Sequence, residues 1–510
     1  MAEGPRFHSG GEVRMRLCGH VLFALFVTLA AGAQQKADGA GSGTAPARAY
    51  VAAHQQEILK EFQDFLALPN LASDLPNIQK NADALLKMTE RRGLKTRLLT
   101  MENVPPVVLA EAPSDPSRRT VIFYAHYDGQ PVQRDQWKQD PWQPTLVKGS
   151  DERIYARSAS DDKAAVVGLL AAYDALKASR AEPSVNIKFF FEGEEEAGSP
   201  HLGQILKRYA DQLNADLWVI CDGPIYQNGQ PLLVFGSRGV VTAQITTFGP
   251  NRPLHSGHYG NWAPNPIVEL AHLISRLRTT EGEILIPHFS DSVRPLTAGE
   301  KKALENLPNL DPQLKQEFQL GRTEGTRPVA EEIMKPSFNL DRIEGGGYGP
   351  NPANAVPSTA TAYIDIRMVP NQTPEIVRGQ MEKYLIDMGY FLVHQPPTPE
   401  ERRSHARVVQ ITWSSGYPPQ RTDIDAPVSR AFVQAVRAAA GTSLVVMPTL
   451  GGSTPAFMFE QQFKKPVIGL PIANFDNNQH AANENIRIDY LFNGIASYTA
   501  VFTNLGNFWH

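Results

Sequence analysis

The hydrophobic pattern alternates between helical and strand periods along most of the chain. Apolar residues recur every three or four positions in segments that predict amphipathic helices, at 47–67, 77–93, 162–178, 201–213, 427–440 and 488–507. Short apolar runs predict buried strands between them, at 119–125, 185–191, 216–221, 443–447 and 466–470. Strands that alternate with helices indicate an α/β fold with a mostly parallel sheet.

The middle of the chain follows a different order. Its segments predict the sequence β-α-β-β-α-β, at 239–248, 265–279, 337–343, 358–368, 373–389 and 405–413. That order is the ferredoxin-like α+β arrangement. We therefore expect a small domain at 239–420, inserted in a larger domain made of 47–238 and 421–510. The polar stretch 280–335 predicts irregular and helical excursions and no further domain.

Length and composition support two globular domains. The 510 residues exceed one ordinary core, and 42% hydrophobic and 20% charged residues are typical of globular proteins. The net charge of −4 and the lack of a basic stripe exclude nucleic acid as an expected partner.

The amino terminus has the pattern of a secretory leader. Arg14 and Arg16 precede the apolar run 21–30 and the small residues 31–33. We expect a signal peptide at 1–33 with cleavage after Ala33, and hence an exported protein, periplasmic or secreted. An uncleaved signal anchor is the alternative, and Met15 is a second candidate start.

The chain after Ala33 is expected to begin with a flexible Gly- and Ala-rich terminus at 34–46. No other hydrophobic run is long enough to cross a membrane, so no stable membrane span is expected after cleavage. Because Cys18 lies in the leader, Cys221 is the single thiol of the mature chain. It ends a buried strand and is interpreted as a small core residue.

An acidic run follows the strand at 185–191. Glu192, Glu194, Glu195 and Glu196 precede the small residues 197–199. Such crowded negative charge needs either a cation or an exposed surface. Taken alone, the run is more simply interpreted as a solvated acidic loop.

Four further potential metal ligands follow predicted strands. They are His126, Asp161, Asp222 and His480. Singly, each has a structural explanation: Asp161 suits a helix N-cap and Asp222 suits a turn. The carboxyl ends of neighbouring parallel strands face one crevice, however, so these residues and the acidic run are expected to converge.

Together the five strand ends predict a metal site. Two imidazoles and three carboxylates suit Zn²⁺ first, with Mn²⁺ or Co²⁺ as substitutes. Five side chains are too many for one catalytic zinc with an open position, but they suit two metals that share a bridging carboxylate.

With these motifs the chain resembles the dinuclear zinc exopeptidases, a family that includes carnosinase-type dipeptidases, aminoacylase and bacterial glutamate carboxypeptidase. The matching motifs are 125–128, Ser160-Asp161-Asp162-Lys163, 194–199, Asp222 and Gln479-His480. The resemblance covers nearly all of the chain after the leader. It implies a zinc-exopeptidase-like catalytic domain and an inserted ferredoxin-like domain that serves as lid and dimerisation domain.

The resemblance also implies a role for each ligand. Asp161 bridges the two metals. His126 and Asp222 complete one metal site, and Glu196 and His480 complete the other.

Glu195, directly before the ligand Glu196, resembles the general base that acts on a metal-activated bridging water. Asp128 is expected to orient His126 and to fix its tautomer. The register rests on 197–199, which follows the ligand in the family pattern. Glu192 and Glu194 are then expected to be supporting or exposed residues.

The inserted domain and the late loops supply further residues by resemblance. His255 matches the histidine that reaches the active site of the other subunit and polarises the scissile carbonyl, so a homodimer is expected. Arg367 matches the arginine that grips the substrate carboxylate. Asn354 and Ser453 match substrate contacts. Singly, His255 and Arg367 are more simply a turn histidine and a surface arginine.

Three departures from the family pattern concern local geometry and specificity. The usual Gly-Arg-Gly is Ala156-Arg157-Ser158, and Ala164 replaces a glycine. The stretch 413–417 lacks the second lid histidine of carnosinase-type enzymes.

The resulting hypothesis is an exported di-zinc exopeptidase that acts on dipeptides or short peptides with a free carboxylate. The alternatives are an N-acyl amino acid deacylase, a glutamate-type carboxypeptidase, or a metal-binding relative that has lost catalysis.

Overall fold

The computed structural model describes residues 44–346 and 354–510. The predicted leader at 1–33, the alternative start at Met15 and most of the predicted flexible terminus lie outside the described residues. Helix α1 (Ala45–Leu66) begins inside the segment predicted to be flexible, with a proline in its first turn.

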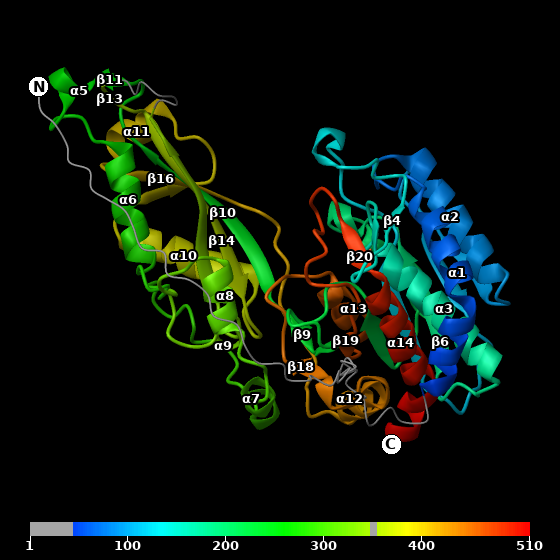
Figure 1. Cartoon of the computed structure of the whole chain (residues 1–510). Coiled ribbons are helices and arrows are strands. Elements are labelled where there is room, and N and C mark those ends of the chain that lie inside the picture. Colours follow the sequence, from blue (N-terminus) through cyan, green and yellow to red (C-terminus); the bar gives the residue numbers. More distant parts are fainter. Residues whose placement is uncertain (1–43, 347–353) are drawn as a thin grey trace, which may run out of the picture. The chain divides into compact units, whose positions relative to one another are not determined.

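An eight-stranded sheet forms the centre of the larger part of the molecule (Figure 1). In spatial order its strands are β1 (Lys95–Leu99), β2 (Val107–Glu111), β6 (Asn186–Glu192), β3 (Thr120–His126), β7 (Leu217–Ile220), β19 (Val467–Gly469), β8 (Leu232–Val234) and β18 (Val445–Met447). The pairs β6–β3, β3–β7, β7–β19 and β8–β18 are parallel, whereas β1, β2 and the β8–β19 junction pair antiparallel. The expected mostly parallel sheet is confirmed in its centre.

Helices cover both faces of this sheet. One face packs against α1, α2 (Leu75–Glu90), α3 (Lys163–Ser179), α12 (Pro427–Ala440) and α14 (Ile488–Phe508). The opposite face packs against α4 (Leu202–Arg208) and α13 (Ala456–Phe463). Because side chains alternate along a strand, Phe189 and Phe191 enter the first core and Phe190 enters the second.

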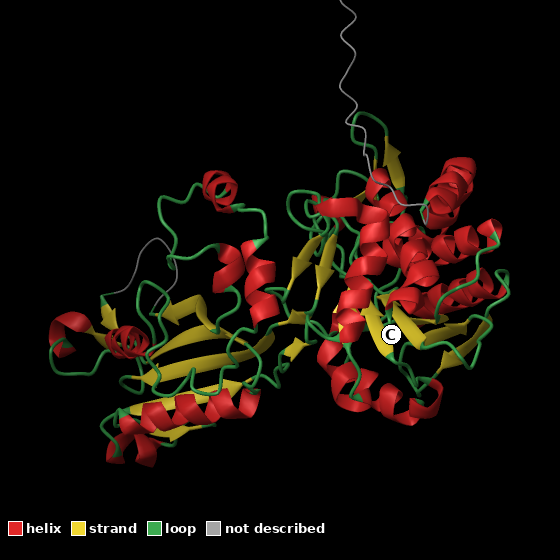
Figure 2. Cartoon of the chain, turned by 90° about the horizontal axis from the view of Figure 1, so that it is seen from below, coloured by secondary structure: helices red, strands yellow, loops and turns green. Residues whose placement is uncertain are grey.

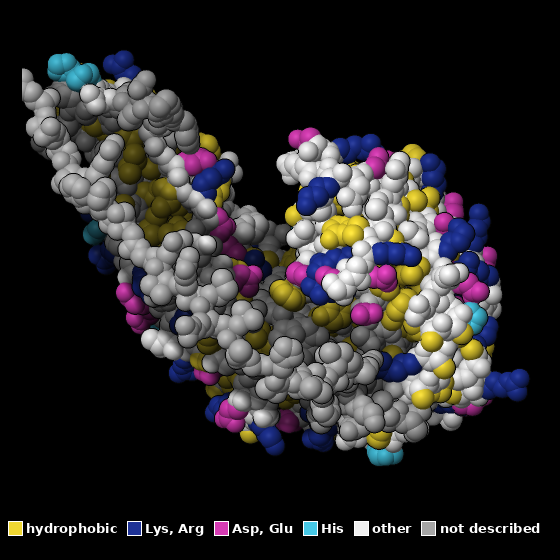
Figure 3. Space-filling model, in the orientation of Figure 1, with side chains coloured by type: hydrophobic (Ala, Val, Ile, Leu, Met, Phe, Trp, Pro, Cys, Tyr) yellow, Lys and Arg dark blue, Asp and Glu magenta, His cyan; other side chains and the backbone are white. Residues whose placement is uncertain are grey.

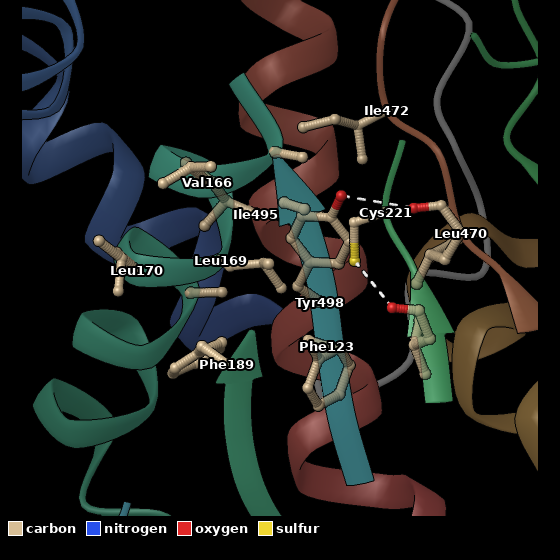
Figure 4. Close-up of a cluster of buried hydrophobic side chains, with 14 of the residues drawn as sticks. Phe123, Val166, Leu169, Leu170, Phe189, Cys221, Leu470, Ile472, Ile495 and Tyr498 are labelled. Carbon is tan, nitrogen blue, oxygen red and sulfur yellow. Dashed lines mark hydrogen bonds between the residues drawn. The ribbon is translucent and has the colours of Figure 1, made fainter. Parts of the chain in front are cut away.

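Cys221 lies within the first of these cores. Figure 4 shows it beside Phe123, Leu470 and Tyr498. It is free and buried, and burial raises the pKa of its thiol well above the ordinary value. This environment agrees with the interpretation of Cys221 as a core residue.

A second, five-stranded sheet contains the predicted ferredoxin-like order. Its strands are β12 (Ser337–Gly345), β14 (Thr359–Met368), β10 (Gly239–Phe248), β16 (Val408–Trp413) and β15 (Phe391–Val393). Helices α6 (Pro266–Leu277) and α10 (Pro374–Asp387) pack with its apolar side chains. Figure 2 shows helices and a sheet together in this part of the molecule. The predicted fold class is confirmed, and strand β15 adds an edge that the periodicity did not predict.

The polar stretch 280–335 folds into short helices, as expected. They are α7 (Ala298–Glu305), α8 (Asp311–Glu317) and α9 (Val329–Glu332). Leu307, Leu310 and Ile333 pack against a cluster at the β8–β18 edge of the larger sheet. This stretch therefore contacts the larger sheet although it lies within 239–420, and the boundaries of the inserted domain stay a prediction.

The remaining strands form small antiparallel sheets. One contains β20 (Asn485–Arg487), β5 (Arg153–Tyr155) and β4 (Thr145–Val147). The others pair β11 (Leu254–His255) with β13 (Ala355–Val356), and β17 (Gln420–Arg421) with β9 (Gly236–Ser237). The strand that precedes Asp161, β5, thus belongs to a small sheet and not to the eight-stranded one.

Candidate metal centre and active site

Three adjacent parallel strands deliver acidic and histidine side chains to one edge of the eight-stranded sheet. His126 and Glu192 are the paired last residues of β3 and β6, and Asp222 follows β7 by two residues. Asp161 comes from the loop before α3, and His480 comes from the loop between β19 and β20. The convergence expected from the strand ends is thus present, with two loops completing it.

The side chains form two groups that can each hold a cation. One contains His126, Asp162 and Asp222, and the other contains Asp161, Glu196 and His480. Within each group the donor atoms lie within 4.8 Å of one another. All five predicted ligands are therefore brought together.

Asp161 belongs to the second group and also reaches His126 of the first. Its Oδ1 is 2.9 Å from His126 Nε2, and its Oδ2 is 3.1 Å from His480 Nε2. His480 Nε2 is also 3.2 Å from Glu196 Oε2. One carboxylate oxygen directed at each group is the geometry that a bridging ligand needs.

Asp162 was not among the predicted ligands. It is buried, and its Oδ2 accepts a hydrogen bond from the His126 backbone N–H at 3.2 Å. Burial and the neighbouring Asp222 raise its pKa well above the ordinary value. The signal was present in the sequence, because Asp162 follows Asp161 directly in the Asp-Asp-Lys motif.

The electrostatics of the cluster favour added positive charge. Burial and Asp161 raise the pKa of Asp222 to about 7. Burial opposes ionisation of Asp161, but hydrogen bonds with His126 and His480 outweigh it and lower its pKa. Hydrogen bonds to Asp161 and Glu196 raise the pKa of His480 to about 10. The cluster thus contains more carboxylates than imidazoles and has an excess of negative charge. This set of nitrogen and oxygen donors fits two divalent cations.

Asp128 connects His126 to the acidic turn. Its Oδ1 lies 3.3 Å from His126 Nδ1. The same oxygen accepts from the Glu195 N–H at 3.0 Å, and Oδ2 accepts from the Glu196 N–H at 3.0 Å. Asp128 is fully buried, so one carboxylate fixes the positions of His126 and of both glutamates.

Glu192 and Glu194 are buried and have protein partners of their own. Tyr124 donates its hydroxyl to Glu192 at 2.7 Å, and burial raises the pKa of Glu192 to about 8. Glu194 accepts from the His201 N–H at 2.9 Å. Both are supporting residues and not exposed ones. Gly193 between them is required, because a Cβ there would clash with the Tyr127 hydroxyl.

Glu484 ties the two loops that carry Asp161 and His480. Its Oε1 accepts from the N–H groups of Ser160 and Asp161 at 2.9 and 3.0 Å. Its Oε2 accepts from Arg157 Nη1 at 2.7 Å and from the Ser158 N–H at 2.9 Å. Sequence reasoning assigned Glu484 no role, because a buried carboxylate that binds backbone amides has no motif of its own.

The predicted substrate contacts fall into two pairs. Arg367 Nη1 donates to Ser453 Oγ at 3.1 Å. His255 lies beside Asn354, whose carbonyl accepts from the Ser256 N–H at 2.8 Å. His255 and Asn354 are exposed, and within the described part of the chain neither is hydrogen-bonded to a metal-site residue.

The tautomer of His255 is set locally. Its Nδ1 accepts a hydrogen bond from the Gly257 N–H at 3.0 Å, so the neutral ring carries its proton on Nε2. Histidine side chains are visible at the surface over α5 (Ser256–Tyr259) and β11 (Figure 3). The ring therefore presents a donor to the outside.

Two of the departures from the family pattern lie in well-defined local structure. Ser158 adopts a left-handed φ of 61°, the conformation that glycine favours, and its hydroxyl accepts from Asn70 Nδ2 at 2.9 Å. In the stretch without the lid histidine, Tyr417 donates its hydroxyl to the Gly198 carbonyl at 2.5 Å.

Comparison with known proteins connects this geometry to a family. The sequence profile of Peptidase family M20/M25/M40 matches residues 122–504. The beta-Ala-His dipeptidase of Rattus norvegicus is 27% identical, covering 89% of this chain and 94% of that protein. The Cys-Gly metallodipeptidase dug1 of Schizosaccharomyces pombe is also 27% identical, covering 86% and 94%. The crystal structure of the M20 family metallo-carboxypeptidase Sso-CP2 from Sulfolobus solfataricus has a TM-score of 0.75 and 28% identity, covering 88% and 99%.

The comparisons contradict the prediction of export. The relatives that cover most of this chain include yeast Cys-Gly metallodipeptidases, and nothing in these similarities points to a secretory signal. The apolar run that suggested a leader lies outside the described residues. Among residues 44–346 and 354–510, no helix combines the length and apolar character needed to span a membrane.

Proposed function

The chain belongs to peptidase family M20/M25/M40, a family of metal-dependent hydrolases, and from this premise we propose that it is a di-zinc dipeptidase. Its substrates are dipeptides or short peptides with a free C-terminal carboxylate. The observation that carries the proposal is the position of Asp161, which directs one oxygen at each of two ligand groups.

His126 and Asp222 would hold one metal, Glu196 and His480 would hold the other, and Asp161 would contribute to both. Zinc suits this mixture of imidazole and carboxylate donors. When bound, two such ions lower the pKa of water and polarise the carbonyl of the scissile peptide bond.

Glu195 is the general base in this proposal. Its carboxylate accepts the proton of the attacking water and returns it to the nitrogen of the leaving amine. The hydrogen bond from its N–H to Asp128 fixes its backbone beside the ligand Glu196. Adjacent residues on one short turn thus divide ligation and proton transfer.

Residues of the segment 239–420 and of a loop closer to the C-terminus orient the substrate. Arg367 and Ser453 bind the terminal carboxylate, and Asn354 contributes a polar contact. His255 donates a hydrogen bond from its Nε2–H to the carbonyl oxygen of the scissile bond, across the interface of a homodimer. The exposure of His255 and its fixed tautomer support this role.

The names of the relatives support the substrate class, since dipeptidases and carboxypeptidases both cleave next to a free carboxylate. They give no support to an N-acyl amino acid deacylase or to a glutamate-type carboxypeptidase.

The experiment compares dipeptides with N-acetyl amino acids on zinc-loaded protein. We expect turnover of dipeptides and little turnover of N-acetyl amino acids. The reverse preference would contradict the proposal, and metal binding without turnover of either class would identify a non-catalytic relative.

A further inference from the structure

A cavity of about 450 Å³ contains three arginines. It is lined by Arg238, Arg278, Arg367, Asp365, Gly451 and Gly452, among others. A neighbouring cavity is lined by the metal-site residue Asp222 and by Ser237 and Leu450. Ser237 and Leu450 directly precede Arg238 and Gly451 in the chain, so consecutive residues of the same two segments line the two cavities.

Two of the three guanidinium groups have carboxylate partners. Arg367 Nε and Nη2 both lie 3.0 Å from Asp365 Oδ2. Arg278 Nη2 lies 2.9 Å from Glu324 Oε2. The charge of these two arginines is therefore compensated within the protein.

Arg238 bonds only to neutral acceptors. Its Nε donates to the Gly451 carbonyl at 2.9 Å, and its Nη1 donates to Ser337 Oγ at 3.3 Å. Within 44–346 and 354–510, no carboxylate lies at ion-pairing distance from Arg238, and its Nη2 has no hydrogen-bond acceptor.

The surroundings of Arg238 disfavour its charge. Burial, and then repulsion by Arg367, lower the pKa of Arg238 to about 10. Its guanidinium stays protonated at neutral pH, and its two hydrogen bonds go to neutral oxygens, although Asp365 attracts it from beyond ion-pairing distance. An anion that enters the cavity forms a charge-assisted hydrogen bond there, at little cost in ordering because Gly451 and Ser337 already fix the group.

We propose that Arg238 is the specificity-determining cation of the substrate site, and that it binds the terminal carboxylate together with Arg367. This inference rests on the proposed function. The proposed function gives binding of the terminal carboxylate to Arg367 and Ser453. Here Arg238 supplies the positive charge that lacks an ion-pair partner, because Asp365 already pairs with Arg367. The predicted substrate class is peptides that end in a free acid, with discrimination against their C-terminal amides.

The test compares a dipeptide with its C-terminal amide on wild type, Arg238→Gln and Arg238→Lys. Arg278→Gln is the matched control, since it removes an arginine of the same cavity whose charge Glu324 compensates. We expect Arg238→Gln to raise KM for the free acid by about 10- to 100-fold with a smaller change in kcat, the loss of one charge-assisted hydrogen bond. Arg238→Gln is expected to lose the preference for the free acid over the amide. Arg238→Lys should keep part of this preference, and Arg278→Gln should keep all of it.

An unchanged acid-to-amide preference in Arg238→Gln would overturn the inference. If Arg238→Gln does not fold, Arg238→Lys decides, because it keeps the charge but loses the planar fork. An unchanged KM for the acid in that variant would also overturn the inference.

A binding measurement separates this inference from the proposed function. Calorimetry of the dipeptide on Glu195→Gln, and on Glu195→Gln combined with Arg238→Lys, needs no turnover. Weaker binding in the double variant supports the role of Arg238 even if wild type hydrolyses no dipeptide, and equal binding contradicts it even if wild type is active.

Discussion

At the scale of single residues, buried carboxylates that accept backbone N–H groups hold the site together. Asp128 accepts from Glu195 and Glu196, and Glu484 accepts from the segment around Asp161. Such residues determine where ligands point without being ligands themselves.

The sequence pointed to the candidate ligands more readily than to the residues that support them. His126, Asp161, Glu196, Asp222 and His480 follow predicted strands or belong to motifs of a known family, and the structure brings them together. Asp162, Glu484 and Arg238 were missed. Their importance depends on which atom faces which neighbour, and neither hydrophobic period nor motif spacing contains that information.

The Glu484→Gln variant tests how much the hydrogen bonds of this buried carboxylate stabilise the protein. The amide keeps the volume but leaves Arg157 and several backbone amides without a charged acceptor, so we expect a loss of about 3–5 kcal/mol of stability. Thermal unfolding of metal-free protein measures this loss without any contribution from metal binding.

The control for this prediction is Glu182→Gln, since Glu182 is mostly exposed and lies 3.4 Å from Arg118. Its melting temperature should match that of wild type. Equal melting temperatures of Glu484→Gln and wild type would show that the network contributes no stability.

At the scale of elements, the periodicity predicted the long helices and central strands within a few residues. For example, α12 was expected at 427–440 and is Pro427–Ala440. Strands β1 and β2 were missed. Strand β1 is exposed or half-buried at four of its five positions, so it has no continuous buried apolar run. The segment at 201–213 is a shorter helix followed by a 3-10 turn.

The packing of α14 gives a prediction at this scale. A Cβ on Gly506 would clash with the carbonyl oxygen of Ser184, which belongs to rigid backbone. We expect Gly506→Ala to destabilise the protein by about 1–3 kcal/mol, as overpacking does in other cores. Urea unfolding measures the change.

Gly203→Ala is the matched control, because a Cβ at this position in α4 would meet nothing within 4 Å. Alanine there should be neutral or stabilise by up to about 1 kcal/mol. A destabilisation of the same size in both variants would refute the packing argument.

At the scale of the whole molecule, an ion network ties the loop before His480 to the small sheet. Asp476 Oδ2 lies 2.7 Å from Arg153 Nη2 and 2.6 Å from Arg487 Nη2. Burial opposes the charge of Asp476, but hydrogen bonds from Arg487, Arg153 and Asn474 outweigh it and lower its pKa.

This shift predicts a pH dependence of stability. A carboxyl whose pKa is lower in the folded state stabilises the protein above its unfolded pKa of about 4, and the contribution is lost as the pH falls through the folded pKa. We expect the melting temperature of metal-free wild type to fall more between pH 5 and pH 3 than that of Asp476→Asn. Asp476 is about one-third exposed, so solvent screening keeps the difference modest. Parallel curves would contradict this prediction.

The proposed homodimer is also tested at this scale. His255→Ala and Glu195→Gln are each expected to be inactive. If His255 acts across the interface, a mixed dimer contains one complete site, so random mixing should restore about a quarter of wild-type activity. No recovery in a mixture shown to contain mixed dimers would place His255 in its own subunit's site.

The role of Glu195 as general base is tested by measuring turnover and metal content of Glu195→Gln, with Glu194→Gln as a control. Glu194 is bonded to His201 and lies outside both ligand groups. We expect Glu195→Gln to retain two metals per chain and to lose about 10²- to 10⁴-fold in kcat on dipeptides, the contribution of a general base. Glu194→Gln is expected to keep most of its activity. Full activity of Glu195→Gln with two metals bound would contradict the assignment of the base, and with it the proposed mechanism.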